Sequence, residues 1–232
     1  MPLWIILGMM QPILYLLLYM PLLKNIGGTS VLPVGQIVQI FVPGMLVIMG
    51  VSCLFAGFSF IPEIRTGFIT RLLVAPISRY SLLLGYILEQ CCSLLLQAIV
   101  LLVISLLLGL KAGVLGVALS LILIILIGTT MTALSYVISI TTRNEDGLAS
   151  MVNTLYLPIM LLSGIMLPIS LAPDWLKTAA HFNPFYYAVE AARALFAGNF
   201  SEAIVWQGFL VMIAAAAFAV YLAAKSLRKM SA

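Results

Sequence analysis

The chain has 232 residues, of which 64% are hydrophobic and only 8% are charged, and its formal net charge is +4. Ordinary soluble domains are about 45–50% apolar and about 25% charged, so this composition excludes a soluble domain and predicts an integral membrane protein. Long continuously apolar runs indicate helices, because a membrane β-barrel would show short alternating segments. The fold class is therefore all-α, and the positive charge points to membrane-side loops and not to nucleic acid.

Six apolar segments are long enough to cross the hydrocarbon as helices. In chain order they are Leu3–Leu23, Ile37–Phe60, Leu82–Leu110, Val114–Ile140, Leu148–Pro168 and Ala203–Ala224. Prolines and a glycine inside the first, second and fifth of them predict kinks: Pro12, Pro43, Pro158 and Gly164. No basic residue precedes the first segment, and its length and flanks favour a true span over a cleaved signal peptide.

Basic residues are unequally divided between the two sides of the predicted membrane. The loops after spans two and four, with the tail, hold seven of them: Arg65, Arg71, Arg79, Arg143, Lys225, Arg228 and Lys229. The other loops hold four: Lys24, Lys111, Lys177 and Arg193. By the positive-inside rule we expect the first side, and both termini, to be cytoplasmic.

The segment Ile61–Gly85, between spans two and three, concentrates charge in a chain that has little of it. Its charged residues and chain-bending residues are Glu63, Arg65, Gly67, Arg71, Pro76 and Arg79. The pattern predicts an element at the membrane surface to which a partner protein can bind. The alternative is that the arginines only anchor the loop on the cytoplasmic side.

Glu89 is the one acidic residue clearly inside a predicted span. Acidic residues within the membrane are costly and are candidates for function. We favour an ion pair between Glu89 and a basic residue of the cytoplasmic surface, such as Arg79 or Arg143. Binding of a cationic substrate, or transfer of a proton, is the alternative.

The connection Ile169–Glu202, before the last span, is too long for a turn and too polar for a further span. Trp175, after a Pro-Asp helix start, is typical of a membrane interface, and Asn183-Pro184 ends that helix before a second one over Phe185–Phe196. Glu190 and Arg193 are three residues apart and share a helix face. We expect two short external helices, with Glu190 and Arg193 as a local ion pair or as part of an exit gate.

Motifs for catalysis are missing from the sequence. It contains no G-x-x-x-x-G-K-[ST] phosphate-binding loop and no H-E-x-x-H metal motif. Its single histidine is His181, and its three cysteines lie in apolar stretches. We therefore expect no enzyme activity, no metal site and no cofactor in this chain.

Two motif regions resemble the membrane subunit of ABC-2 type exporters. The first is Glu63…Gly67…Arg71…Ala75-Pro76…Ser78-Arg79, followed by Gly85. The second is Ser163-Gly164…Pro168…Pro173-Asp174-Trp175-Leu176…Asn183-Pro184…Arg193, and Pro43-Gly44 also fits. One difference is that the amphipathic helix with which that family begins is missing before Leu3.

The resemblance implies a single transmembrane domain over residues 1–232, with six spans, a cytoplasmic coupling helix between spans two and three, and two external helices between spans five and six. It also implies a pair of permeases, as homodimer or heterodimer, working with separate ATP-binding subunits that carry ATP and Mg²⁺. Because few polar residues are available to line a path, we expect an amphipathic drug or lipid-like cargo. The alternatives are a polysaccharide exporter permease and an ATP-independent secondary transporter or channel.

Overall fold

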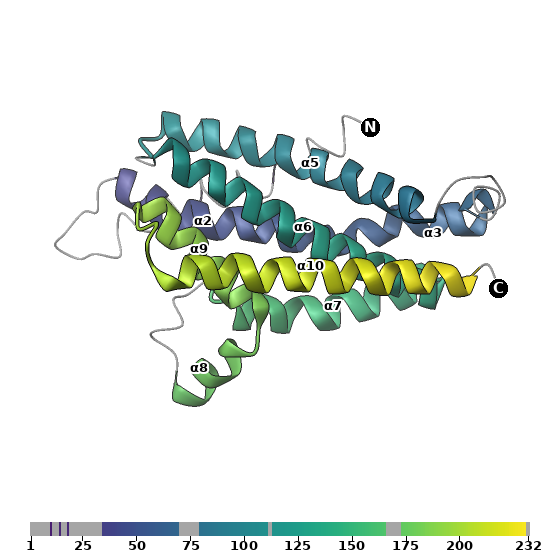
Figure 1. The fold of residues 1–232 in the computed structure, drawn as a ribbon. Coiled ribbons are helices and arrows are strands. Elements are labelled where there is room, and N and C mark those ends of the chain that lie inside the picture. Colours follow the sequence, from purple (N-terminus) through teal and green to yellow (C-terminus); the bar gives the residue numbers. More distant parts are fainter. Residues whose placement is uncertain are drawn as a thin grey trace.

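The computed structural model describes residues 34–69, 79–110, 113–165 and 173–230, and the single positions Met10, Leu14 and Leu18. Within these residues every regular element is a helix (Figure 1). The helices are α2 (Val34–Ser52), the 3-10 helix η1 (Cys53–Ala56), α3 (Gly57–Arg65), α5 (Arg79–Leu107), α6 (Val114–Thr142), α7 (Glu145–Leu162), α8 (Asp174–His181), α9 (Pro184–Ala197) and α10 (Ala203–Met230). The all-helical class is confirmed.

Four of the expected spans correspond, in the described part of the chain, to helices long and apolar enough to cross a membrane. These are Phe41–Arg65, Tyr80–Leu107, Val114–Thr142 and Ala203–Arg228. The fifth expected span is α7, which begins with Glu145 and Asp146 and is less apolar. The first lies outside the described residues except at three exposed helical positions, so the full six-span topology stays a prediction.

The second span is longer than the sequence predicts. We placed the start of the following loop at Ile61, but α3 continues to Arg65. The turn after it contains Gly67, whose φ of 72° lies in the left-handed region that glycine tolerates. Phe60 and Ile61 are buried at this point. Burial of these two side chains keeps the chain helical past the predicted boundary, so Glu63 and Arg65 belong to the end of a span.

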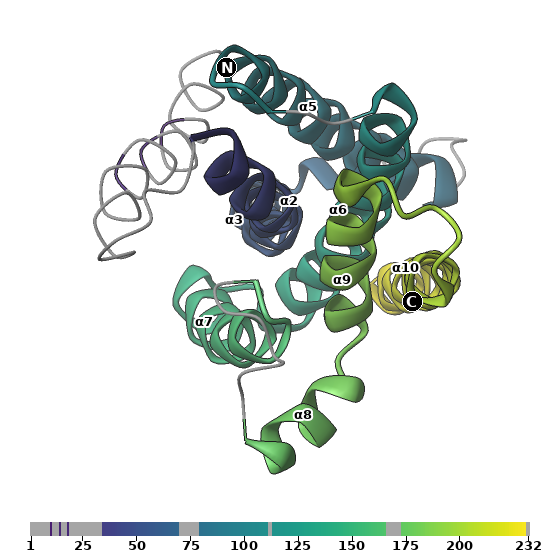
Figure 2. The same ribbon diagram turned by 90° about the vertical axis from the view of Figure 1, so that its left-hand side faces the viewer.

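Helix α6 lies at the centre of the bundle. It packs against α2, α3, α5, α7, α9 and α10, and Figure 2 shows the other long helices arranged around it. Small and hydroxyl side chains let neighbouring backbones approach this helix closely. At Gly116, for example, an added Cβ would collide with the backbone carbonyl of Leu195 in α9.

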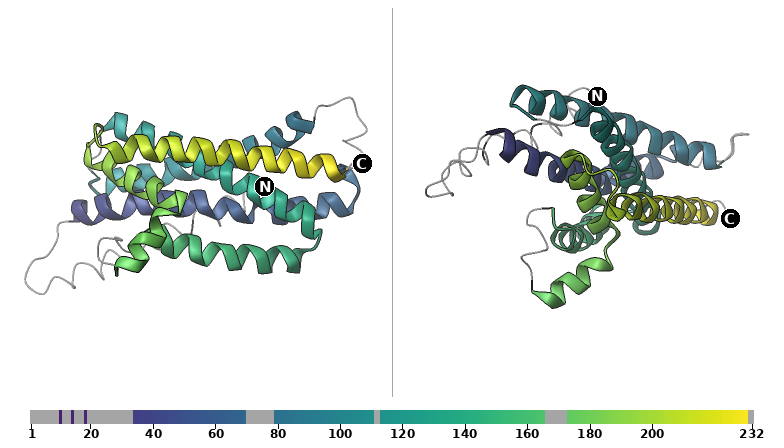
Figure 3. Two further views of the ribbon diagram at one scale, coloured as in Figure 1. Left: turned by 60° about the horizontal axis from the view of Figure 1, so that its bottom comes forward. Right: turned by 60° about the vertical axis from the view of Figure 1, so that its left-hand side comes forward.

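Most charged ends of the helices gather at one end of the bundle. Helices α3, α6 and α10 end there, and α5 and α7 begin there (Figure 1). We call it the basic end, defined by Arg65, Arg143 and Arg228. The short helices α8 and α9 lie toward the opposite end, and α8 projects from the side of the bundle (Figures 2 and 3).

Candidate functional site

Three aromatic rings join helices α3, α5 and α6 near the basic end. The ring centroids of Phe60 and Tyr86 are 5.2 Å apart at an interplanar angle of 86°, those of Phe60 and Tyr136 are 4.8 Å apart, and those of Tyr86 and Tyr136 are 6.0 Å apart. Such tilted and edge-to-face arrangements are the favourable ones for aromatic pairs. The cluster fixes the position of Tyr86 on α5.

The hydroxyl of Tyr86 donates a hydrogen bond to the carboxylate of Glu63. Glu63 is half-buried at the end of the second span, and this bond joins α3 to α5. The carboxylate that the sequence assigned to a partner contact is therefore engaged within the bundle. Its contact with an ATPase stays a prediction.

Arg65, the last residue of α3, contacts the segment between α6 and α7 at the basic end. One Nη atom donates to Oδ1 of Asn144 at 3.2 Å, and the other lies 3.7 Å from Oε1 of Glu145. Both partners of the ion pair are about half exposed, at 53% and 50%, so we expect it to add little to stability. Its effect is to hold the end of α3 beside the start of α7.

The other predicted coupling residues are only partly described. Gly67 lies in the turn after α3, with no atom within 4 Å of the position that a Cβ would take. Arg71 and Pro76 lie outside the described residues. Arg79 is the first residue of α5, and its side chain is not among those described.

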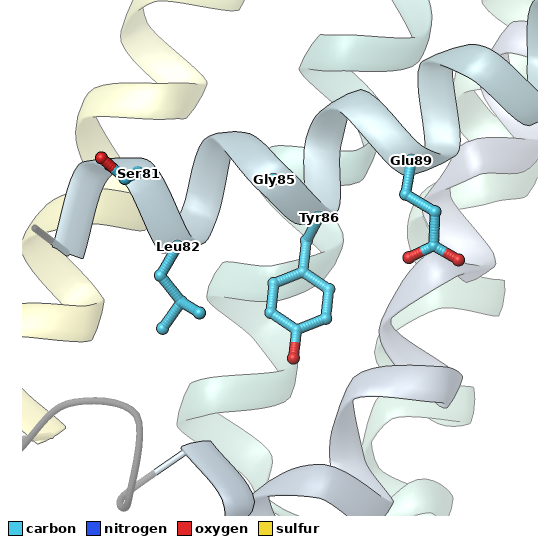
Figure 4. Close-up of a pocket in the computed structure, with 5 residues that line it drawn as sticks. All are labelled: Ser81, Leu82, Gly85, Tyr86 and Glu89. Atoms are coloured by element: carbon cyan, nitrogen blue, oxygen red, sulfur yellow. The ribbon is translucent and has the colours of Figure 1, made fainter. Parts of the chain in front are cut away.

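A pocket lies along the first part of α5, next to the aromatic rings. Its volume is about 360 Å³, and it is lined by Ser81, Leu82, Gly85, Tyr86 and Glu89. Figure 4 shows the side chains of Leu82, Tyr86 and Glu89 on one side of α5, with Ser81 pointing the other way. The pocket thus combines apolar surface, an aromatic ring and one carboxylate.

Glu89 does not form an ion pair with Arg143, one of the two partners that we favoured. The side chain of the other, Arg79, lies outside the described part of the structure, so that pairing stays a prediction. The ion pairs among the described residues are Arg65–Glu145, Lys177–Asp174 and Arg193–Glu190. Glu89 stands ten residues into α5, about 15 Å along the helix from the basic end. Arg143 instead caps the C-terminus of α6 at the basic end itself, in the left-handed conformation (φ 51°). The two residues therefore lie at different depths.

At the opposite end, α9 is tied to its neighbours by polar side chains. Asn183 caps α9 by accepting from the backbone N–H of Phe185 at 3.1 Å, and its amide donates to the carbonyl of Ile159 in α7 at 3.2 Å. Pro184 is the first residue of α9. The predicted break between the two short helices α8 and α9 is confirmed.

Arg193 makes two contacts from the middle of α9. It pairs with Glu190 at 2.7 Å and donates to the carbonyl of Gly164, just after α7, at 2.8 Å. The predicted local ion pair is therefore confirmed, and the second contact joins α9 to the end of α7. No sequence signal predicts that second contact, because its acceptor is a backbone carbonyl.

The projecting helix α8 carries exposed aromatic side chains. Trp175 is 71% exposed and Phe182 is 86% exposed. His181 packs beside the ring of Tyr186, with the centroids 5.2 Å apart. Burial raises the pKa of the Tyr186 hydroxyl above its usual value, and the nearby carboxylate of Glu190 adds to the shift.

Among the described residues, no group of His, Cys, Asp or Glu side chains could hold a metal ion.

Long apolar helices around a central helix, with the charged residues gathered at the ends, define a multi-pass membrane protein. Residues 1–197 match the ABC-2 type transporter family, and the chain belongs to it. It is similar to proteins named "Putative transport permease ycf38": it is 28% identical to the one in Pyropia yezoensis, over 85% of this chain and 70% of that protein, and 27% identical to the one in Porphyra purpurea over the same shares. A protein of the same name in Cyanophora paradoxa is 27% identical over 84% of this chain and 68% of its own length.

Membership of this family determines the division of labour. The family provides the membrane domain of a transporter and lacks the nucleotide-binding domain, so the chain is a permease and is not itself an enzyme. ABC-2 type permeases work with ATP-binding subunits. The helices and pocket described above therefore belong to the membrane domain of a transporter.

Proposed function

We propose that the chain is the permease subunit of an ATP-driven exporter that moves an amphipathic small molecule, drug or lipid-like cargo across the cytoplasmic membrane. The observation that carries the proposal is the family match over residues 1–197. The missing phosphate-binding loop supports it, because a chain without that loop needs a partner to use ATP. In the proposed unit, two permeases, identical or siblings, pair above two ATP-binding subunits that hold ATP and Mg²⁺.

In this proposal the basic end is cytoplasmic and receives the ATP-binding subunit. The residues after α3, including Gly67, Arg71, Pro76 and Arg79, form the coupling element, and the contact of Arg65 with Asn144 and Glu145 brings the second cytoplasmic connection beside it. A guanidinium in such a place gives strong, directed bonds to carboxylates. Movement of the ATP-binding subunits then shifts the ends of α3, α5 and α7 together.

At the other end we assign α8 and α9 to the outer surface. The exposed rings of Trp175 and Phe182 suit the boundary between lipid and water. Asn183, Pro184, Glu190 and Arg193 set the position of α9 against α7 and form the frame of an exit gate. Alternating access requires this frame to exist in two arrangements.

The apolar character of the helices favours an amphipathic cargo over a sugar chain. A polysaccharide would need a path rich in polar and aromatic groups, and the described buried polar residues are few: Ser105, Ser120, Thr130, Thr132, Ser135, Ser139, Ser163 and Asn183. Most of these hydroxyls bond to their own helix backbone or to a neighbouring one. A polysaccharide exporter is therefore the second candidate within the family.

Copurification tests the transporter class. The permease, purified from membranes in mild detergent, should carry an ATP-binding subunit, and the ATPase activity of the complex in nanodiscs should rise several-fold with an accepted amphiphile. If transport does not depend on ATP and no such subunit copurifies, the protein is instead a secondary transporter or channel.

A matched pair of substitutions tests the coupling element. Gly67→Trp places a large side chain in the turn after α3, and Gly198→Trp does the same after α9, at the opposite end. Both glycines have a positive φ, 72° and 84°, and no atom lies within 4 Å of either added Cβ, so the backbone strain is similar. We expect at least a tenfold loss of cargo-stimulated ATPase activity for Gly67→Trp and less than a twofold loss for Gly198→Trp. Equal losses would contradict a docking role for this turn.

A further inference from the structure

The pocket on α5 places the carboxylate of Glu89 next to the aromatic ring of Tyr86. Glu89 and Tyr86 are three residues apart and point to the same side of the helix (Figure 4). In the described part of the chain Glu89 takes part in no ion pair. Arg65, on the neighbouring α3, is directed to Asn144 and Glu145. No cationic side chain among the described residues therefore competes with a ligand for the carboxylate of Glu89.

A carboxylate on a membrane-spanning helix favours a positive ligand. An ionised acid at such a depth is costly unless a positive group neutralises it. The face of a tyrosine ring attracts the same kind of group, most strongly a quaternary ammonium from which water has been removed. Both lining groups therefore select for one chemistry, an organic cation.

The surroundings of the pocket indicate what the rest of the ligand is like. Ser81, Gly85 and Glu89 are exposed, so the pocket opens to the outside of the bundle. Leu84 and Leu88, on the same stretch of α5, are also exposed, at 53% and 64%. A volume of about 360 Å³ holds a head group, while an apolar tail can lie along the leucines. An amphiphile can enter this pocket from the lipid.

The hydrogen bond between Tyr86 and Glu63 links the pocket to the basic end of the bundle. The phenol is held from three directions: by Glu63 through its hydroxyl and by Phe60 and Tyr136 through its ring. Glu63 is two residues from the end of α3 at Arg65. A ligand in contact with the Tyr86 ring is therefore connected, through Glu63, to the end of α3 at the basic end.

We propose that this pocket binds the cationic head group of an amphiphilic cargo, with Glu89 as its counter-ion, Tyr86 as its aromatic wall, and Glu63 as the positioning residue that orients Tyr86. The proposal names the cargo class of the permease and rests on the proposed function for the claim that the bound amphiphile is transported. The binding step itself needs no nucleotide.

Two probes that differ only in charge test the head-group claim. Dodecyltrimethylammonium and its neutral isostere, with carbon in place of the ammonium nitrogen, are bound in radiolabelled form to the permease complex in nanodiscs without nucleotide. We expect Glu89→Gln to weaken binding of the ammonium about tenfold and to change binding of the neutral probe less than twofold. Glu202→Gln, at an exposed glutamate beyond α9, is the matched control and should leave both unchanged.

Variants at Tyr86 and Glu63 test the positioning role. Tyr86→Leu removes the aromatic wall and should weaken ammonium binding most, whereas Tyr86→Phe keeps the ring and loses only the bond to Glu63, for a loss of about threefold. Glu63→Ala should match Tyr86→Phe. Glu63→Gln retains an oxygen that can accept from the hydroxyl, so it should restore most of the binding lost in Glu63→Ala.

Three results would overturn the cation site. They are equal losses for the two probes, an unchanged affinity in Glu89→Gln, and a change in the number of permease copies per nanodisc in that variant, which would make Glu89 a contact with a basic residue of a second copy. The proposed function fails on a different result. If the ammonium binds as expected but its transport does not depend on ATP, the cation site is supported and the ATP-driven mechanism is contradicted.

Discussion

Ser135 and Ser139 of α6 complete the hydrogen bonding of an irregular turn in another helix. Ser135 donates to the carbonyl of Leu54 and accepts from the backbone N–H of Gly57 at 2.8 Å. The hydroxyl of Ser139 lies between two carbonyl acceptors, that of Ser135 in its own helix at 2.8 Å and that of Gly57 at 3.2 Å. The backbone groups of Leu54 and Gly57 lie at the 3-10 helix η1, where the regular α-helical bonding of the second span is interrupted. In an apolar environment each such group needs a partner.

Gly57 makes this contact possible because it has no Cβ. An added Cβ would lie 2.6 Å from Oγ of Ser135 and still closer to Ser139. The two helices therefore meet at a glycine on one side and two serines on the other, as small residues allow in membrane bundles.

Removing the Ser135 hydroxyl should destabilise the protein. Ser135→Ala leaves the Leu54 carbonyl and the Gly57 N–H without this partner, and an unsatisfied buried group costs about 1–3 kcal/mol. We expect a lower thermal unfolding midpoint of the purified permease in detergent. Thr154→Ala is the control, because the exposed Thr154 hydroxyl bonds only to its own helix; it should change stability by less than about 0.5 kcal/mol. A Ser135→Ala protein as stable as the control would show that the contact adds nothing.

The break in the second span is an element that the sequence could not locate. Pro43 predicts a kink, yet it lies within the regular helix α2, and the 3-10 turn falls at Cys53–Ala56, where there is no proline. The turn depends on hydroxyl groups from α6, about 80 residues further along the chain. Local sequence contains no such information, because the serine partners become neighbours only on folding.

The short helices α8 and α9 were easier to predict, since their signals are local. Asn183-Pro184 is a capping residue followed by a favourable first helical residue, and Glu190 and Arg193 share a face at a spacing of three. What the sequence did not show is that both Asn183 and Arg193 also donate to carbonyls of the α7 region. Backbone acceptors carry no residue signature, so such ties are found only in the structure.

Arg193→Lys tests the tie between α9 and α7. The planar guanidinium reaches Glu190 and the carbonyl of Gly164 at once, and an ammonium presents a single centre that cannot match both. We expect a loss of about 1–3 kcal/mol, as for a buried carbonyl left without its donor, measured by unfolding in detergent. Arg65→Lys is the matched control, because its ion pair is about half exposed and should contribute at most about 1 kcal/mol. Equal effects would mean that Arg193 acts only as a surface charge.

At the scale of the whole molecule, composition and hydropathy predicted the fold class and four spans well. The fifth span was predicted to begin at Leu148, whereas the corresponding helix α7 begins three residues earlier, at Glu145. Charge and apolarity average over many residues, so they identify long helices reliably. They do not determine which helices touch, and the central place of α6 and the Tyr86–Glu63 bond followed only from packing.

The orientation of the bundle follows from the same charge asymmetry and can be tested directly. We expect the basic end to be cytoplasmic, since seven of the eleven Lys and Arg residues fall in the connections and tail assigned to that side. Asp146→Cys, at the start of α7, and Glu202→Cys, before α10, are both exposed acidic positions and lie at opposite ends. Each is introduced into a protein in which Cys53, Cys91 and Cys92 are replaced by alanine.

Right-side-out membrane vesicles are then treated with a maleimide that does not cross membranes. The expected result is labelling of Glu202→Cys in intact vesicles, and labelling of Asp146→Cys only after the membrane is opened. Neither substitution changes the count of basic residues, and each removes one acidic residue, so the pair is matched in charge. The reverse pattern would place the basic end outside. In that case neither Arg65 nor the turn at Gly67 could meet an ATP-binding subunit in the cytoplasm, and the coupling role of this end would have to be abandoned.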